Sequence, residues 1–432
     1  MPCRNLMLKA RPDRRYIRST YRSNRFVLAE INAPHAHAET GRKRPPVNLA
    51  FVLDRSGSMS GEKIRLAKLA VEQSIARLNS DDRFAVIVYD DKIDVAFPSA
   101  AATPENRRSA LRRLALFDAR NQTNLGEGWL RGCEQVALQL LEDGVNRCLL
   151  LTDGLANVGI TDPNELARHA GELRQRGVST TTFGVGTDFN EQLLQAMATF
   201  GGGNFYYIAD AAQIADHVAS EVGEALDVVA HDVVLELTAP EGVSIESLSP
   251  FPVEERGGRT VISLGAMVAE QVSQVVLRLN FPFGEIGRET GVVVALADRD
   301  GIADGASVSL AWEYADGKMN DAQPRDIEVD RAVASVFAAR ARQEATIHNR
   351  RGDYAGAAAA LAAVAKRIRG YARSDVELKL VVAELERDAA EVAMPMPAAS
   401  LKEMHFRSYA SAKMRMPDGT AMRRPRPDDQ RS

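Results

Sequence analysis

The sequence predicts an α/β protein in which a doubly wound, mainly parallel β-sheet is inserted in a β-sandwich and followed by a helical region. From residue 47 to residue 226, short apolar runs alternate with longer amphipathic stretches, as in parallel sheets covered by helices on both faces. From about Asp227 the helical periodicity stops, and short apolar runs are separated by prolines and glycines. After Pro324 the chain becomes alanine-rich, with apolar residues at helical spacing.

The α/β region begins at residues 47–53, a continuous apolar run that is typical of a strand buried on both faces. Apolar residues at helical spacing then predict a helix at 61–78. A strand at 84–89 is followed by a tight turn, so we expect residues 93–97 to pair back antiparallel at the sheet edge. The same patterns predict further helices at 104–114, 126–141, 163–176, 191–200 and 213–226, and strands at 147–151, 178–185 and 204–208.

The β-sandwich is predicted from regularly spaced short strands separated by turn residues. A single strand at 26–31 lies before the α/β region and is separated from it by a linker rich in proline, histidine and alanine. We expect this strand to join the later sandwich, so that the α/β domain is an insertion in it. The later strands are predicted at 233–237, 243–248, 259–264, 271–279, 291–296 and 307–314.

Five segments follow from these patterns. They are a basic N-terminal arm with a strand joining the β-sandwich (1–45), the α/β domain (46–226), the β-sandwich (227–323), a helical bundle (324–395) and a flexible tail (396–432). The bundle is expected to contain helices at 327–350, 354–369 and 375–392. The tail is low in aliphatic residues, so we expect little packed structure there.

Composition narrows the class of protein. The chain has 432 residues, 45% of them hydrophobic, and a formal net charge of −4, which argues against a generic nucleic-acid binder or a membrane-surface protein. Its three cysteines are odd in number and far apart, which favours a reducing compartment over a disulfide framework. Residues 1–10 lack the apolar core of a secretory signal, and no apolar run is long enough to span a membrane. We therefore expect a cytoplasmic protein with neither nucleic-acid nor membrane partners.

Asp54, Ser56 and Ser58 directly follow the buried strand at 47–53. In an extended loop, residues two apart point the same way, so one carboxylate and two hydroxyls can face a single cation. A structural alternative exists for each of these residues. Ser58 or Ser60 could cap the following helix, and Asp153-Gly154 could form only a turn.

Three segments in this order resemble the von Willebrand factor A (VWA) domain and its metal-ion-dependent adhesion site: Asp54-x-Ser56-x-Ser58, Thr123-Asn124-Leu125 and Thr152-Asp153-Gly154. The resemblance implies that Ser56 and Ser58 ligate Mg²⁺ directly, with Mn²⁺ or Ca²⁺ as alternatives. Thr123 would ligate directly or through water, and Asp54 and Asp153 would hold the ion, often through its bound waters. One departure concerns Asn121-Gln122, where the family often has small residues. The whole chain resembles bacterial intracellular VWA proteins related to inter-alpha-trypsin inhibitor heavy chains.

Two carboxylates and three neutral hydroxyls would leave the ion electrophilic toward a further anion, such as an Asp or Glu side chain of a partner. We therefore expect a non-enzymatic, Mg²⁺-dependent adaptor, and the resemblance implies MoxR-type AAA+ ATPases as partners. One alternative is a Mg²⁺-dependent hydrolase or phosphatase with Asp54 as nucleophile, although Ser56 stands where such enzymes usually place a second acid. Another is a structural subunit whose own tail fills the site through Glu403, Asp418, Asp428 or Asp429.

Overall fold

A computed structural model of the chain describes residues 5–36, 43–120 and 122–424. The described residues form two compact units. The sandwich unit contains residues 5–35, 230–417 and 421–424, and the α/β unit contains residues 36, 43–120, 122–229 and 418–420. Because the α/β unit lies between two parts of the other unit in sequence, it is an insertion, as the sequence predicts.

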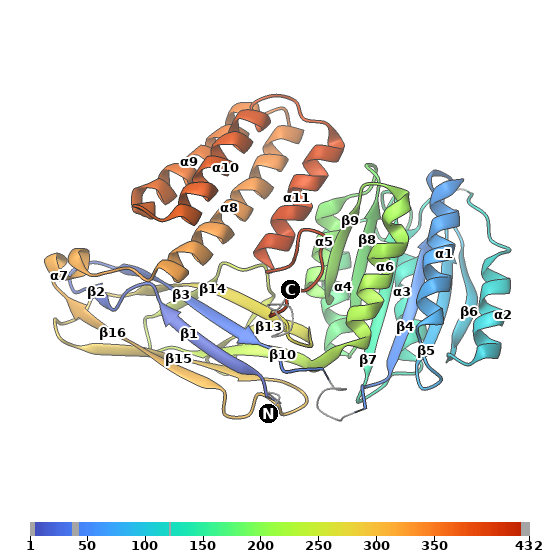
Figure 1. Cartoon of the computed structure of the whole chain (residues 1–432), viewed down its shortest axis with the longest axis horizontal. Coiled ribbons are helices and arrows are strands. Elements are labelled where there is room, and N and C mark those ends of the chain that lie inside the picture. The colour runs from blue at the N-terminus through green and yellow to red at the C-terminus, as the bar shows by residue number, and fades with distance from the viewer. Residues whose placement is uncertain (1–4, 37–42, 121, 425–432) are drawn as a thin grey trace, which may run out of the picture. The chain divides into compact units, whose positions relative to one another are not determined.

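The α/β unit is built on a six-stranded sheet in the order β6-β5-β4-β7-β8-β9 (Figure 1). All neighbouring pairs are parallel except β5 and β6, and β6 lies antiparallel at the edge, as expected. Helices cover both faces, which explains why β4 is buried along its whole length. The strands are β4 (Val47–Asp54), β5 (Arg83–Tyr89), β6 (Ile93–Ala101), β7 (Val145–Thr152), β8 (Ser179–Val185) and β9 (Gly202–Ile208). The helices are α1 (Glu62–Ala76), α2 (Pro104–Leu114), α3 (Leu125–Ala137), α4 (Pro163–Gln175), α5 (Glu191–Phe200) and α6 (Ile214–Leu226).

The sandwich unit contains two sheets, in the orders β1-β3-β14-β11 and β12-β13-β10-β15-β16-β2. The strand before the α/β unit, β3, pairs antiparallel with β14, which confirms that it joins the later sandwich. Three strands were not predicted: β1 (Met7–Pro12) and β2 (Tyr16–Arg18) in the basic arm, and β12 (Val253–Arg256). The other strands are β3 (Ser23–Asn32), β10 (Val228–Thr238), β11 (Ser244–Ser247), β13 (Arg259–Val268), β14 (Val272–Phe281), β15 (Glu289–Ala297) and β16 (Ser307–Ala315).

The arginines of the basic arm meet acids of the same unit. Arg18 pairs with Asp321 at 2.7 Å, and Arg15 pairs with Glu313 at 3.2 Å. Exposed pairs of this kind contribute little stability each, but they give partners to the arginines of this basic segment, whose strands β1 and β2 lie at sheet edges.

The helical region of the sandwich unit begins with a short helix, α7 (Gly317–Ala322), and the three predicted helices follow as α8 (Ile327–Arg350), α9 (Tyr354–Ala372) and α10 (Val376–Val392). These three share one apolar core that includes Ala338, Leu361 and Leu385. The amino-terminal half of α8 packs on the sandwich, where Val329 and Val333 join a cluster with strand residues. In the described part of the chain, no helix is both long enough and apolar enough to cross a membrane.

The expectation of a flexible tail at 396–432 is wrong for its first half. Helix α11 occupies Ala398–Ala412, and its Leu401, Phe406 and Tyr409 are buried. These side chains recur at helical spacing among lysine, arginine and serine residues, so the segment is low in aliphatic residues although it has a packed face. The predicted tail acids Asp428 and Asp429 lie outside the described residues.

Candidate metal centre

The first segment of the site begins where β4 ends at Asp54. Asp54 Oδ1 accepts a hydrogen bond from the Ser56 backbone N–H at 2.8 Å, which turns the chain and directs the serine hydroxyls toward each other. Ser56 Oγ and Ser58 Oγ lie 3.1 Å apart. Helix α1 has Gly61 as its N-cap, with φ +77° and no side-chain cap hydrogen bond. Neither Ser58 nor Ser60 therefore caps this helix, and the capping alternative is wrong.

The second segment follows β7, the strand beside β4. Thr152 Oγ1 donates to Asp54 Oδ2 at 2.6 Å and accepts from the Gly154 backbone N–H at 3.1 Å. Asp153 Oδ1 accepts from Ser58 Oγ at 2.6 Å. Asp153-Gly154 is thus more than a turn, because hydrogen bonds link Asp54, Ser58 and Asp153 across two strands.

Thr123 reaches the same place from the loop before α3. Its backbone N–H donates to Asn157 Oδ1 at 3.2 Å, and the next residue, Asn124, caps α3 by accepting from the Glu127 N–H. A Cβ atom placed on Gly154 would lie 3.1 Å from Thr123 Oγ1, 3.8 Å from Asp54 Oδ2 and 3.9 Å from Ser58 Oγ. All three segments therefore converge on the space that the missing side chain of Gly154 leaves open. Asn121, the departure before Thr123, lies outside the described residues.

The two carboxylates of this cradle are buried, which favours a cation beside them. Asp54 and Asp153 are 0% and 1% exposed, whereas Ser58 is exposed and opens the cradle to solvent. Burial raises the pKa of Asp54 to about 6 against the hydrogen bonds from Thr152 and Ser56, and the neighbouring Asp153 charge raises it further. Carboxylates and hydroxyls are the hard oxygen donors that Mg²⁺, Mn²⁺ and Ca²⁺ prefer. The five predicted residues thus fit a hard divalent cation.

No group of three or more His, Cys, Asp or Glu side chains in the described ranges could by itself hold a metal. A divalent cation at this place would therefore need the hydroxyl oxygens of Ser56, Ser58 and Thr123 as much as the two carboxylates.

Lys63 is a component of the site that sequence reasoning missed. Its Nζ forms an ion pair with Asp153 Oδ2 and a hydrogen bond to the same atom. The lysine lies in the first turn of α1, five residues after Ser58, and its ammonium supplies positive charge at Asp153 Oδ2. The sequence signal was a basic residue in the first helical turn, where the helix dipole disfavours positive charge.

A buried ion-pair network holds the loops together, and sequence reasoning missed it too. Asp90, directly after β5, accepts from Arg120 Nε at 2.6 Å and lies 3.3 Å from Arg55 Nε. Burial disfavours the charged form, but hydrogen bonds from the Lys92 backbone and Arg120 hold the pKa of Asp90 below its ordinary value. The backbone adds two links, from Arg120 N–H to Arg55 C=O at 2.7 Å and from Asn124 N–H to Asp90 C=O at 2.8 Å. The loop of Thr123 is therefore fastened to the loop of Asp54.

The pKa of Asp54 predicts how stability depends on pH without metal. Its folded pKa of about 6 exceeds the ordinary value of 3.8, so between these values the folded state binds more protons than the unfolded state. Asp54 therefore contributes its full stabilisation of the folded state below about pH 4. This stabilisation is lost as pH rises through 6, and the free energy of unfolding falls by about 3 kcal/mol in total. In EDTA, the free energy of unfolding of wild type relative to Asp54→Asn should fall over this window in urea titrations. A constant difference between the two proteins would contradict the raised pKa.

A parallel sheet covered by helices on both faces, with serine, threonine and aspartate oxygens converging at the carboxyl ends of β4 and β7, is the arrangement of a VWA domain. Residues 48–220 match the family model of the von Willebrand factor type A domain, and this part of the chain is a VWA domain. A solved structure described as von Willebrand factor type A from Catenulispora acidiphila shares the fold over 91% of this chain and 98% of that one, with a TM-score of 0.69 and 18% identity.

Two curated relatives match over lengths close to that of this domain. YfbK of Escherichia coli strain K12 is 34% identical over 191 residues, which are 44% of this chain and 33% of YfbK. Human inter-alpha-trypsin inhibitor heavy chain H4 is 32% identical over 180 residues, which are 39% of this chain and 19% of the heavy chain. The chain therefore spans only a third or less of the length of these two relatives.

Proposed function

We propose that this chain is a non-enzymatic protein-interaction module that binds an Asp or Glu side chain of a partner through a Mg²⁺ ion. The observation that carries this proposal is the cradle around Gly154, where two buried carboxylates and three hydroxyls converge and Ser58 opens to solvent. Open α/β sheets bind their ligands at this carboxyl edge.

Each residue of the cradle has a role in this proposal. Ser56, Ser58 and Thr123 present neutral hydroxyl oxygens as direct ligands. Asp54 is fixed by hydrogen bonds from Ser56 and Thr152, and together with Asp153 it supplies the negative charge. When bound, the divalent cation would supply Lewis acidity toward a partner's carboxylate, because most of its direct protein ligands are neutral.

We extend the proposal to the cellular setting that the family resemblance implies. The partner would be a protein, with MoxR-type AAA+ ATPases as the first candidates, and the module would act in the cytoplasm as an adaptor without nucleic-acid or membrane partners. The ATPase partner and the cytoplasmic setting rest on resemblance and composition, and they are tested independently of the metal site.

The two alternatives have less support from the structure. Asp54 makes a poor nucleophile, because it is 0% exposed and both of its oxygens accept hydrogen bonds. The described tail acids are engaged locally. Glu403 pairs with Arg407 at 2.6 Å, and Asp418 Oδ1 accepts from the Thr420 N–H and hydroxyl at 2.9 and 2.7 Å.

An affinity pull-down from the protein's own cell lysate tests the proposed function. A partner should be retained by wild type in Mg²⁺ and lost in EDTA or with Asp54→Ala, because both changes remove the bridging ion. Asp143→Ala is the matched control, since Asp143 is an exposed aspartate in the loop before β7, at the opposite end of the sheet. A partner retained equally in EDTA and by Asp54→Ala would show that binding does not use the metal.

A further inference from the structure

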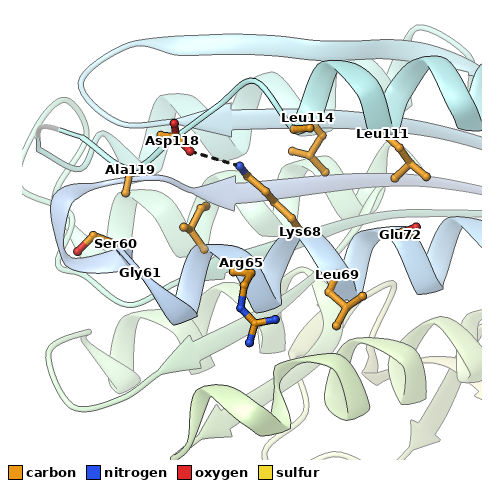
Figure 2. Close-up of a pocket in the computed structure, with 12 residues that line it drawn as sticks. Ser60, Gly61, Arg65, Lys68, Leu69, Glu72, Leu111, Leu114, Asp118 and Ala119 are labelled. Atoms are coloured by element: carbon orange, nitrogen blue, oxygen red, sulfur yellow. Dashed lines mark ion pairs between the residues drawn. The ribbon is translucent and has the colours of Figure 1, made fainter.

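A groove of about 670 Å³ lies between α1 and α2 and begins at the metal loop (Figure 2). Ser60 and Gly61 line its near end, two residues beyond Ser58. Its sides include the apolar Ile64 and Leu69 of α1 and Leu111 and Leu114 of α2, and the charged Arg65 and Glu72 of α1 also line it. The groove therefore continues the surface of the candidate metal centre within the same unit.

Lys68 places a positive charge inside this groove. Figure 2 shows its side chain extending from α1 across the groove toward Asp118. Lys68 Nζ lies 3.7 Å from Asp118 Oδ1, which is too long for a hydrogen bond, and the side chains are 20% and 93% exposed. A nearly fully exposed carboxylate is a weak, solvent-screened counterion. A carboxylate of a ligand that enters the groove could displace it at little cost.

The charge of the two helices favours an acidic ligand. Together α1 and α2 carry seven basic residues against three acidic ones, although the whole chain has a net charge of −4. The exposed Arg108 and Arg112 of α2 add positive charge beside the groove. A positive surface on an acidic protein gives electrostatic complementarity to an acidic segment and speeds its encounter.

We propose that the partner's binding segment is an extended acidic peptide with two anchoring carboxylates. This inference rests on the proposed function, because the first carboxylate would bind at the metal centre. The second would pair with the Lys68 ammonium, and an aliphatic side chain beside it would pack between Leu69 and Leu111. Lys68 lies six residues beyond Glu62, the first residue of α1, so it is about 9 Å along the helix axis from the end of α1 that follows the metal loop. An extended peptide covers this distance in about three residues.

Selection from a random, phage-displayed 12-residue peptide library tests both carboxylates. Peptides captured by immobilised wild-type protein in Mg²⁺ and released by EDTA should carry two acidic residues separated by about two to four positions, with an aliphatic residue beside one of them. The most enriched peptide, made synthetically with a fluorophore, then gives a Kd by fluorescence polarisation for each variant.

The variants have expected effects of opposite sign. Lys68→Glu should weaken binding of the selected peptide by about tenfold or more, because it replaces an attraction by a repulsion. Asp118→Ala should strengthen binding, because it removes the carboxylate that competes for Lys68. Arg131→Glu on α3, which reverses a half-exposed charge outside the groove, is the matched control and should leave the Kd unchanged. Circular dichroism and Tm establish that each variant is folded.

The outcomes separate the two ideas. If no peptide is released by EDTA, or if Asp54→Ala binds the selected peptide as wild type does, the proposed function fails and this inference fails with it. Alternatively, the EDTA-released peptides could have only one acidic residue in common and bind the Lys68→Glu variant as tightly as the wild-type protein. The metal-dependent function would then stand, and the groove would have no role in it.

Discussion

Asp153→Asn is expected to lower the affinity for Mn²⁺ or Mg²⁺ by about 100-fold, the upper end of the range for groups that act on a metal through its outer shell. Asp153 is 1% exposed and accepts a hydrogen bond from Ser58 Oγ, so the substitution removes one of the two charges of the cradle and leaves the shape almost unchanged. Isothermal titration calorimetry with Mn²⁺ measures the affinity directly. Wild type should also gain about 2.7 kcal/mol of unfolding free energy at a metal concentration of 100 Kd, and the variant should gain almost none at that concentration.

Lys63→Met is expected to change the metal affinity of the same site in the opposite direction. The Lys63 ammonium pairs with Asp153 Oδ2, so it competes with a metal for the charge of that carboxylate. Its removal should raise metal affinity by about tenfold, since a unit charge about 4 Å away is worth on the order of 1–4 kcal/mol near a protein surface. If Asp153→Asn bound Mn²⁺ as tightly as wild type, the assignment of the cradle as a metal centre would be wrong.

The parts of the site that the sequence predicted are those that directly follow strand signals. Asp54, Ser56 and Ser58 follow a continuous apolar run, and Asp153 follows another, so the rule that parallel strands end at one edge brings them together. Thr123 could be found only through the family resemblance, because its loop follows no strand of its own. The structure places its hydroxyl beside Gly154 with the others.

The parts that sequence reasoning missed depend on contacts between residues far apart in the chain. Arg55 meets Asp90 only after β4 and β5 have paired in register, Asp54 beside Tyr89, and no local pattern contains that pairing. In the sequence, Lys63 looks like an ordinary helix-surface residue, because its ion pair with Asp153 forms only when the loop after β7 lies beside α1. Strand β1 was missed for the same reason. Its residues are exposed or half-buried, and they form a strand only because they pair with β3.

Asp90→Ala is expected to produce the largest loss of stability around the site, about 3–5 kcal/mol, because it leaves Arg55 with much of its charge buried and uncompensated. Arg55 and Asp90 are 3% and 0% exposed, and Asp90 also holds Arg120. The loss should lie toward the lower end of this range, since Arg55 keeps its contact with Asp94. Urea unfolding in EDTA measures the loss without a contribution from the metal.

The same substitution should also weaken metal binding, although Asp90 is not among the predicted ligands. The side chain of Asp90 binds Arg55 and Arg120, whose backbones are joined by a hydrogen bond of 2.7 Å, and its backbone C=O holds Asn124, the residue after Thr123. Loosening this network frees the Thr123 loop from the Asp54 loop, so affinity for Mn²⁺ should fall by about 10- to 100-fold, as for outer-shell partners of metal ligands. Asp94→Ala is the matched control, because Asp94 contacts the same Arg55 but its side chain is 43% exposed, and it should cost less than about 1 kcal/mol. Equal losses from Asp90→Ala and Asp94→Ala would show that Arg55 does not depend on its buried partner, and the fastening of the two loops would then rest on their backbone hydrogen bonds alone.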